Sequence, residues 1–319
     1  MATDIYIISG FLGAGKTTFI QKLLKEAFAK DKVVLIENDF GEISIDTALL
    51  KTGGVEVKEL NSGCICCSLS GDFLKAVHEI VERFHPDKIV IEPSGVGKLS
   101  DIVKACEDRR INHLVTIAAK ITVADVKRCK MYLDNFGEFF ENQIENADAV
   151  LLSRTEEFPE KVAGARRLIE GLNPKAVIFS QPWSGINADD VLSSIQNPFR
   201  EIRSNPHDHE HCEHEGCEHD HCEYDHCAEE IFDTVTIQTS RKYQAVELKT
   251  CLYKAEHEIS GTILRAKGIV KGVNGYLTLQ YVPGDLKITD SAAAGGVLCF
   301  IGKNLNRNEL ARLFDGKGY

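Results

Sequence analysis

Gly10-Phe11-Leu12-Gly13-Ala14-Gly15-Lys16-Thr17 matches the pattern G-x-x-x-x-G-K-[S/T]. The stretch follows the apolar run Ile5–Ser9 and precedes Thr17–Phe28, whose apolar residues recur at helical spacing. In a strand–loop–helix setting, backbone N–H groups and the positive helix terminus bind phosphate. The pattern therefore predicts a nucleotide-phosphate site rather than a chance glycine turn, formed by Gly10, Gly13, Ala14, Gly15, Lys16, Thr17 and Thr18. Lys16 would neutralise the β- and γ-phosphates, and Thr17 would place its hydroxyl on Mg²⁺.

Apolar strand-like runs alternate with helix-period segments through the first two hundred residues or so. This alternation is typical of an α/β domain with a mostly parallel sheet flanked by helices. Besides Ile5–Ser9, the expected strands are Val33–Glu37, Lys88–Glu92, Val115–Val123, Ala149–Ser153 and Ala176–Ser180. A second predicted helix is Asp72–Phe84.

A smaller α+β domain is expected at the carboxy-terminal end of the chain. The predicted elements are two helices, Gln244–Ala255 and Arg307–Phe314, and strands at Thr234–Gln238, Thr262–Val270, Tyr276–Val282 and Val297–Ile301. The expected domains are residues 1–202, a linker at 203–229 and residues 230–319.

Composition excludes several classes of partner. The formal net charge of −11 gives no basic footprint for nucleic acid or an anionic membrane. No apolar run is long enough to span a bilayer and no export signal is recognised, so a cytoplasmic protein is expected. The eleven cysteines are then read as reduced thiols, several of them metal ligands. Four that stand singly in apolar surroundings are expected to be small buried hydrophobes: Cys106, Cys129, Cys251 and Cys299.

The segment His207–Cys227 changes composition abruptly. Its residues include seven His, four Cys and eight Asp or Glu. Such a segment cannot build a core, and imidazole and thiolate favour zinc, nickel, cobalt or copper over magnesium or calcium. Several weak metal sites are predicted, in preference to a merely acidic linker, at His207, His209, His211, Cys212, His214, Cys217, His219, His221, Cys222, His226 and Cys227.

A carboxylate that could organise Mg²⁺ and the attacking water follows the apolar run ending at Glu92. Glu92 is thus a catalytic candidate with Lys16. Three residues on, Gly95 would offer its backbone N–H to the γ-phosphate.

The motifs GFLGAGKT, Glu37-Asn38-Asp39-Phe40-Gly41-Glu42, Gly63-Cys64-Ile65-Cys66-Cys67 and Glu92-Pro93-Ser94-Gly95 occur in this order. Together they resemble the CobW-like P-loop GTPase family, and Leu264-Arg265-Ala266-Lys267-Gly268 is similar to a motif in that family's smaller carboxy-terminal domain. The resemblance implies slow GTP hydrolysis with Mg²⁺, delivery of zinc or cobalt to a client protein or pathway, and a catalytic role for Asp39. A homo-oligomer is compatible with it.

One motif departs from the family pattern. Guanine-reading GTPases usually carry Asn-Lys-x-Asp after a buried strand, whereas this chain has Ser153-Arg154-Thr155-Glu156. Glu156 could accept the guanine N–H groups and Arg154 could lie against the base, but Ser153 is shorter than Asn. A preference for GTP over ATP is expected, with an ordinary polar loop as the alternative.

Cys64, Cys66 and Cys67 place three soft ligands within four residues. Three thiolates would leave a fourth position on a transition metal, zinc first and cobalt or nickel as alternatives, for Glu37, Glu42 or His113. We expect this loop and the Glu37–Glu42 segment to change shape together when the γ-phosphate is present. Two rival functions stay open: metal storage with a vestigial nucleotide site, and a P-loop kinase.

Overall fold

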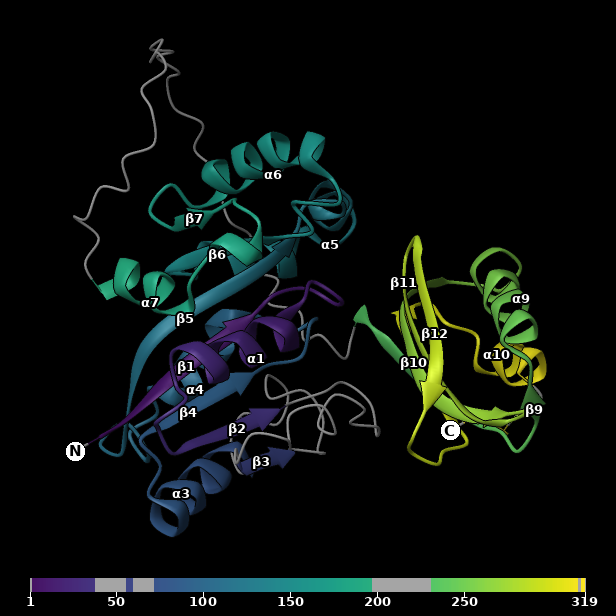
Figure 1. The fold of residues 1–319 in the computed structure, drawn as a ribbon, viewed down its shortest axis with the longest axis horizontal. Helices are drawn as coiled ribbons and strands as arrows, with labels where there is room; N and C mark the ends of the chain where they lie inside the picture. The colour runs from purple at the N-terminus through teal and green to yellow at the C-terminus, as the bar shows by residue number, and fades with distance from the viewer. Residues whose placement is uncertain (1, 38–55, 60–71, 197–230, 315–316, 319) are drawn as a thin grey trace.

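The computed structural model describes residues 2–37, 56–59, 72–196, 231–314 and 317–318. The first 196 residues contain a seven-stranded sheet in the order β3-β2-β4-β1-β5-β6-β7 (Figure 1), and each of its strand pairs is parallel. The strands are β1 (Thr3–Ser9), β2 (Val33–Glu37), β3 (Glu56–Glu59), β4 (Lys88–Glu92), β5 (Val115–Asp125), β6 (Ala149–Ser153) and β7 (Val177–Phe179).

Helices cover both faces of this sheet, because successive buried strand residues point to opposite sides. On one face, Ile8, Leu35 and Val123 pack with Phe19 and other residues of α1 and α7. On the other, alternate residues of the same strands pack against the remaining helices. The helices are α1 (Lys16–Glu26), α3 (Asp72–Phe84), α4 (Leu99–Cys106), α5 (Cys129–Glu145), α6 (Pro159–Leu172) and α7 (Ala188–Gln196).

A smaller α+β domain follows. Its sheet runs β12-β11-β10-β13-β8-β14, with the short β9 paired to β10. Two helices share an apolar core with one face of the sheet. The elements are β8 (Asp233–Gln238), β9 (Lys242–Tyr243), α9 (Ala245–His257), β10 (Thr262–Gly272), β11 (Gly275–Val282), β12 (Asp285–Ser291), β13 (Val297–Lys303), α10 (Arg307–Leu313) and β14 (Lys317–Gly318).

The predicted fold class is confirmed, including the parallel sheet and the separate second sheet. Several strands match their predicted bounds because uninterrupted apolar runs mark fully buried parallel strands. Four strands were not predicted: β3, β12 and the two-residue strands β9 and β14. The strand β12, DLKITDS, lies at the edge of its sheet with every residue half-buried or exposed, so it lacks a strongly apolar run.

The two domains share apolar contacts. Phe232, just before β8, is 2% exposed and lies with its ring centroid 5.1 Å from Phe139 and 5.5 Å from Phe136. Leu264 and Ile301 of the second sheet belong to the same core cluster as residues of the first domain. This contact fixes the second sheet against the first domain without relying on charges.

The single cysteines mostly match expectation. Cys106, Cys129 and Cys299 are buried, whereas Cys251 is partly exposed. Burial raises the pKa of the Cys106 and Cys129 thiols to about 12, so both stay protonated at neutral pH. Among the described residues, no helix combines the length and apolar character needed to cross a bilayer.

Candidate nucleotide and metal site

The glycine-rich loop lies between β1 and α1, at the carboxyl ends of the parallel strands. Gly10, Gly13 and Gly15 have φ values of +139°, +69° and +108°, a region that favours glycine. A Cβ on Gly10 would lie 2.3 Å from the carbonyl oxygen of Val123 on β5, so this position also requires a residue without a side chain. Gly15 precedes α1 directly and uses no side-chain cap, which leaves the first N–H groups of the helix for an anion.

Three side chains meet at these strand ends: Lys16, Thr17 and Glu92. The Thr17 hydroxyl donates to the two carboxylate oxygens of Glu92 at 3.2 and 3.1 Å, and Lys16 Nζ lies 3.9 Å from Glu92 Oε1. Lys16 and Glu92 are 5% and 8% exposed, so their charges interact in a largely water-excluded setting. Mg²⁺ prefers oxygen ligands, and the Thr17 hydroxyl beside the Glu92 carboxylate fits that preference.

Glu37 ends β2 beside this group. It is the register partner of Glu92 across the β2–β4 pair, and it is 3% exposed. Lys267 of β10 approaches from the second domain: burial lowers its pKa to about 8, while the charge of Glu37 raises that pKa and the charge of Lys16 lowers it. Two carboxylates and the Lys16 ammonium therefore lie together at the strand ends, and the charges of Glu37 and Lys16 act on Lys267 of the second domain.

Gly95 lies against the phosphate loop. A Cβ there would stand 2.8 Å from the backbone nitrogen of Leu12, so only glycine allows this approach. The fully buried amide of Gln143 donates to the carbonyl oxygens of Gly95 and Gly97 at 3.1 and 2.8 Å. No sequence motif pointed to Gln143, because it lies on α5, forty-six or more positions from its partners.

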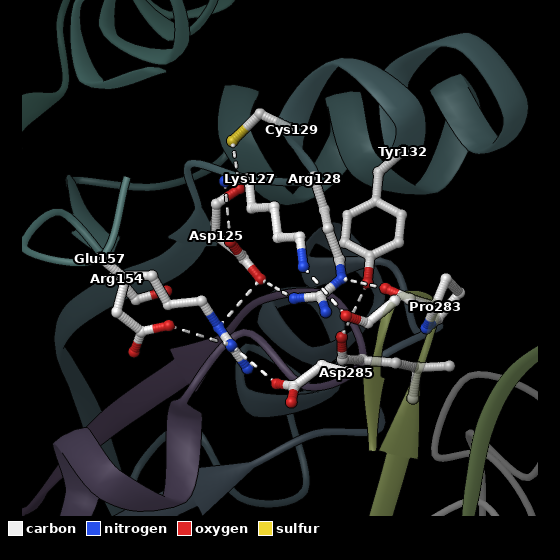
Figure 2. A network of polar contacts seen from close by, with 12 residues as sticks. Asp125, Lys127, Arg128, Cys129, Tyr132, Arg154, Glu157, Pro283 and Asp285 are labelled. Carbon is white, nitrogen blue, oxygen red and sulfur yellow. Dashed lines mark hydrogen bonds and ion pairs between the residues drawn. The ribbon is translucent and has the colours of Figure 1, made fainter. Parts of the chain in front are cut away.

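The predicted base-reading loop follows β6. Ser153 is buried, with its hydroxyl 3.5 Å from the carbonyl oxygen of Ala124, and Arg154 has a φ of +59°. Arg154 forms ion pairs with the buried Asp125 and with Asp285 of the second domain (Figure 2). Glu156 is exposed and accepts a hydrogen bond from the Ser184 hydroxyl at 2.8 Å.

Trp183 borders the same loop, although the sequence analysis did not single it out. Its indole N–H donates to the carbonyl oxygen of Leu152 at 2.8 Å. A Cβ on Gly15 would meet its ring at 3.4 Å, so the ring lies close to the phosphate loop. The only tryptophan of the chain could have drawn attention, but the fold alone brings it to this edge.

A cavity of about 830 Å³ joins these parts. The first domain contributes the phosphate loop, Glu92 and the base-reading loop with Trp183 and Ser184. The second domain contributes a further set of side chains: Arg265, Gln280, Tyr281, Val282, Asp285 and Lys287. The volume and the mixed charge suit a nucleoside triphosphate, and the cavity lies between two domains, where ligand sites commonly occur.

Most predicted metal ligands lie outside the described residues. These ligands are Glu42, Cys64, Cys66 and Cys67, and the whole set from His207 to Cys227. The catalytic candidate Asp39 also lies outside the described residues. Thr17 and Glu37 are described. His113 precedes β5, so it lies at the amino-terminal ends of the parallel strands, whereas Glu37 lies at their carboxyl ends. Within the described part of the chain, no group of three His, Cys, Asp or Glu side chains could hold a metal ion.

Comparison with known proteins agrees with this arrangement. Residues 4–180 match the family model described as "CobW/HypB/UreG, nucleotide-binding domain". The chain belongs to the CobW/HypB/UreG family. Residues 232–317 also match the "Cobalamin synthesis protein cobW C-terminal domain". The family resemblance expected from the motifs is thereby confirmed, and the cavity described above lies at the nucleotide-binding domain of this family.

Individual members of the family align with large parts of the chain. "Zinc chaperone CobW" of Pseudomonas aeruginosa is 32% identical over 242 residues, 65% of this chain and 64% of that protein. "Zinc-regulated GTPase metalloprotein activator 1" of Saccharomyces cerevisiae is 29% identical over 226 residues, 60% of this chain and 52% of that protein. The chain thus spans about half to two thirds of the length of these curated relatives. The crystal structure of the Zn(II)-bound YjiA GTPase from E. coli superposes with a TM-score of 0.45 at 18% identity, covering 99% of this chain and 98% of that one.

Proposed function

We propose that this protein is a GTP-hydrolysing metallochaperone that couples its nucleotide state to the delivery of a transition metal. Zinc is the first candidate, with cobalt or nickel as alternatives, and the recipient is a client metalloprotein. The names of the relatives, zinc chaperone and zinc-regulated GTPase metalloprotein activator, support this class of function. Membership of the CobW/HypB/UreG family supports the nucleotide part.

The observation that carries the proposal is the pairing of Glu37 with Glu92. Glu92 accepts the hydrogen bonds of Thr17, the residue assigned to Mg²⁺, and its neighbour in register is the predicted metal ligand Glu37. Adjacent parallel strands are about 4.8 Å apart. A change at the γ-phosphate that moves Glu92 would therefore act directly on Glu37, the predicted metal ligand on the neighbouring strand. This adjacency gives the coupling a short physical path.

Hydrolysis uses the groups at the strand ends. A water oxygen attacks the γ-phosphorus, the bond to the β–γ bridging oxygen breaks, and GDP and phosphate leave. Lys16 neutralises charge on the transferred group, and Glu92 orients the water and holds Thr17. Thr17 and Glu92 would hold Mg²⁺, which would supply positive charge to the phosphates. The Gly95 N–H donates a hydrogen bond to the γ-phosphate, and this contact is lost on hydrolysis.

Guanine would be read by Glu156, which accepts N–H donors, while Arg154 lies over the base plane and Ser153 closes the end of the strand. The exposed carboxylate of Glu156 beside Ser184, at the rim of the same cavity, supports this assignment. A preference for GTP over ATP follows, because adenine presents an acceptor where guanine presents a donor.

The transition metal is cargo in this proposal. Cys64, Cys66 and Cys67 supply thiolates, with Glu37 or Glu42 completing the site, and the His207–Cys227 segment collects metal weakly. Asp39, between the two carboxylates in sequence, would respond to the γ-phosphate. If GTP strengthens metal binding, metal must strengthen GTP binding by the same factor.

The test is to measure affinity for Zn²⁺, Co²⁺ and Ni²⁺ with and without a non-hydrolysable GTP analogue. A metal affinity that changes with the nucleotide supports the chaperone. The rival, a storage protein with a vestigial nucleotide site, predicts metal binding that ignores the analogue and no GTP turnover. A kinase would pass the γ-phosphate to a small molecule instead of water.

A further inference from the structure

The hairpin between β11 and β12 reaches from the second domain to the base-reading loop. Its two-residue turn, Pro283-Gly284, has Gly284 at a φ of +73°, as a type II turn requires. The first domain donates two hydrogen bonds to this turn (Figure 2). Lys127 Nζ reaches the carbonyl oxygen of Gly284 and Arg128 Nε reaches that of Pro283, each at 3.0 Å.

Asp285, the next residue, holds Arg154. Its Oδ2 lies 2.7 Å from Arg154 Nη1, while Nε of the same guanidinium lies 3.2 Å from Asp125 Oδ2. The two carboxylates therefore bind different edges of one planar group (Figure 2) and define its orientation. Burial lowers the pKa of Arg154, but the hydrogen bond to Asp285 and the charges of Asp125, Asp285 and Glu157 outweigh this effect and raise it.

The same hairpin also touches the phosphate loop. A Cβ on Gly13 would stand 2.5 Å from Val282 Cγ1, so Val282 packs directly on that glycine. Val282 and Asp285, paired across the turn, thus contact the phosphate end and the base end of one cavity. Because the hairpin contacts Gly13 through Val282 and Arg154 through Asp285, it can position the side chains that line the cavity between these two contacts.

We propose that Asp285 is a positioning residue for the nucleotide base. It holds the guanidinium of Arg154 at the angle needed to lie over the base, so that docking of the β11–β12 hairpin and binding of the base strengthen each other. This inference rests on the proposed function, because the ligand is a guanine nucleotide. By reciprocity, a nucleotide that contacts Arg154 tightens the hairpin as much as the hairpin tightens the nucleotide.

The alternative is an ion pair that only joins the two domains. The apolar contact around Phe232, Leu264 and Ile301 already performs that task, and it does not involve the hairpin turn. Removing the Asp285 charge should therefore leave the domains associated and the chain folded. Its effect should be confined to the base end of the cavity.

The test compares the full-length wild type with Asp285→Asn, Asp285→Glu and the control Asp290→Asn. Asp290 lies on the same strand but is exposed, and its substitution removes the same charge. Affinity is measured for GDP and for inorganic tripolyphosphate, which has phosphates but no base. Hydrogen exchange of the backbone amides of residues 281, 282 and 284–286 is followed with and without GDP.

We expect Asp285→Asn to weaken GDP binding ~2- to 5-fold, as for a partly exposed ion pair, with Asp290→Asn unchanged and Asp285→Glu in between. Tripolyphosphate affinity should not change, whereas a general structural defect would lower both affinities. GDP should slow exchange in the wild-type hairpin and much less in Asp285→Asn. Wild-type GDP affinity retained by Asp285→Asn, or equal losses for both ligands, would overturn the positioning role and leave the proposed function intact. A wild type that binds no guanine nucleotide would overturn both.

Discussion

Glu37 and Glu92 are register partners at the carboxyl ends of β2 and β4, and both are buried. Two carboxylates on adjacent strands repel each other unless cations lie nearby. Lys16 is 3.9 Å from Glu92, and the pKa of the buried Lys267 is raised by the charge of Glu37 and lowered by that of Lys16. The nucleotide side and the metal side of the proposed site therefore share one set of charges.

Lys16→Ala should reduce GTP turnover by ~100-fold or more, since the lysine stabilises charge on the transferred phosphoryl group. The fold should survive because the change removes a charged group from the strand ends and not from either apolar core. Turnover is measured by phosphate release and folding by thermal denaturation. Lys22→Ala serves as the control, because Lys22 lies on the same helix and its ammonium pairs with Glu26, one turn along α1. Unchanged turnover in Lys16→Ala would remove the phosphate-loop assignment.

Glu156→Ala should lower the preference for GTP over ATP by ~10- to 100-fold, because two donors of guanine lose a charged acceptor. Competition between labelled GTP and unlabelled ATP measures the ratio. Glu160→Ala, an exposed carboxylate at the start of α6, is the control. Equal competition by ATP in the wild type would show that Ser153-Arg154-Thr155-Glu156 does not discriminate between the bases.

Deleting residues 207–227 should lower the number of weakly bound metal ions while one tight site and GTP hydrolysis remain. The segment has almost no apolar residues to fix ligand geometry, so each of its sites loses affinity to the entropy of ordering. Metal stoichiometry and competition with a chelator distinguish the two classes of site. A shortened chain unable to hold metal tightly contradicts the separation.

Cys66→Ser together with Cys67→Ser should weaken the tight Zn²⁺ site by ~100-fold or more and leave GTP binding indifferent to zinc. Serine keeps the size of cysteine without its soft thiolate. Four Zn²⁺ titrations, of wild type and double mutant with and without a GTP analogue, complete a thermodynamic cycle.

A wild type without nucleotide dependence refutes the coupled switch even if the cysteines bind metal. A double mutant that keeps the dependence moves the coupling elsewhere, with the His207–Cys227 segment as the first candidate.

Cys106 and Cys129 should resist alkylation at pH 8 in the folded protein, whereas Cys251 reacts, because burial raises the pKa of the first two thiols to about 12. Peptide mass spectrometry of iodoacetamide-treated protein reads each site separately. Since the ordinary thiol pKa of 9.0 is lower than the folded value, the unfolded chain loses these protons first. Their contribution to stability is thus complete below pH 9 and declines as the pH rises from 9 toward 12. Rapid labelling of Cys129 at pH 8 would contradict its burial.

The sequence by itself determined the local parts of this protein. The phosphate loop, the strand that ends at Glu92 and the strand that ends at Glu37 are each contained in a few consecutive residues. Their conformation follows from glycine geometry and from the continuous apolar pattern of buried parallel strands. Parallel strands also end at one edge, so Lys16 and Glu92 could be assigned to one site before any contact was known.

Only the tertiary structure decided which distant residues complete that site. Asp285 lies on β12, an edge strand whose alternating pattern is weak, and it meets Arg154 more than a hundred positions away. The buried Asp125 meets Arg154, and Trp183 meets the cavity, in the same way, through crossovers between strands. Side-chain periodicity describes what one element buries against its neighbour. It carries no information on which loop of another domain will meet it, because that depends on packing summed over the whole chain.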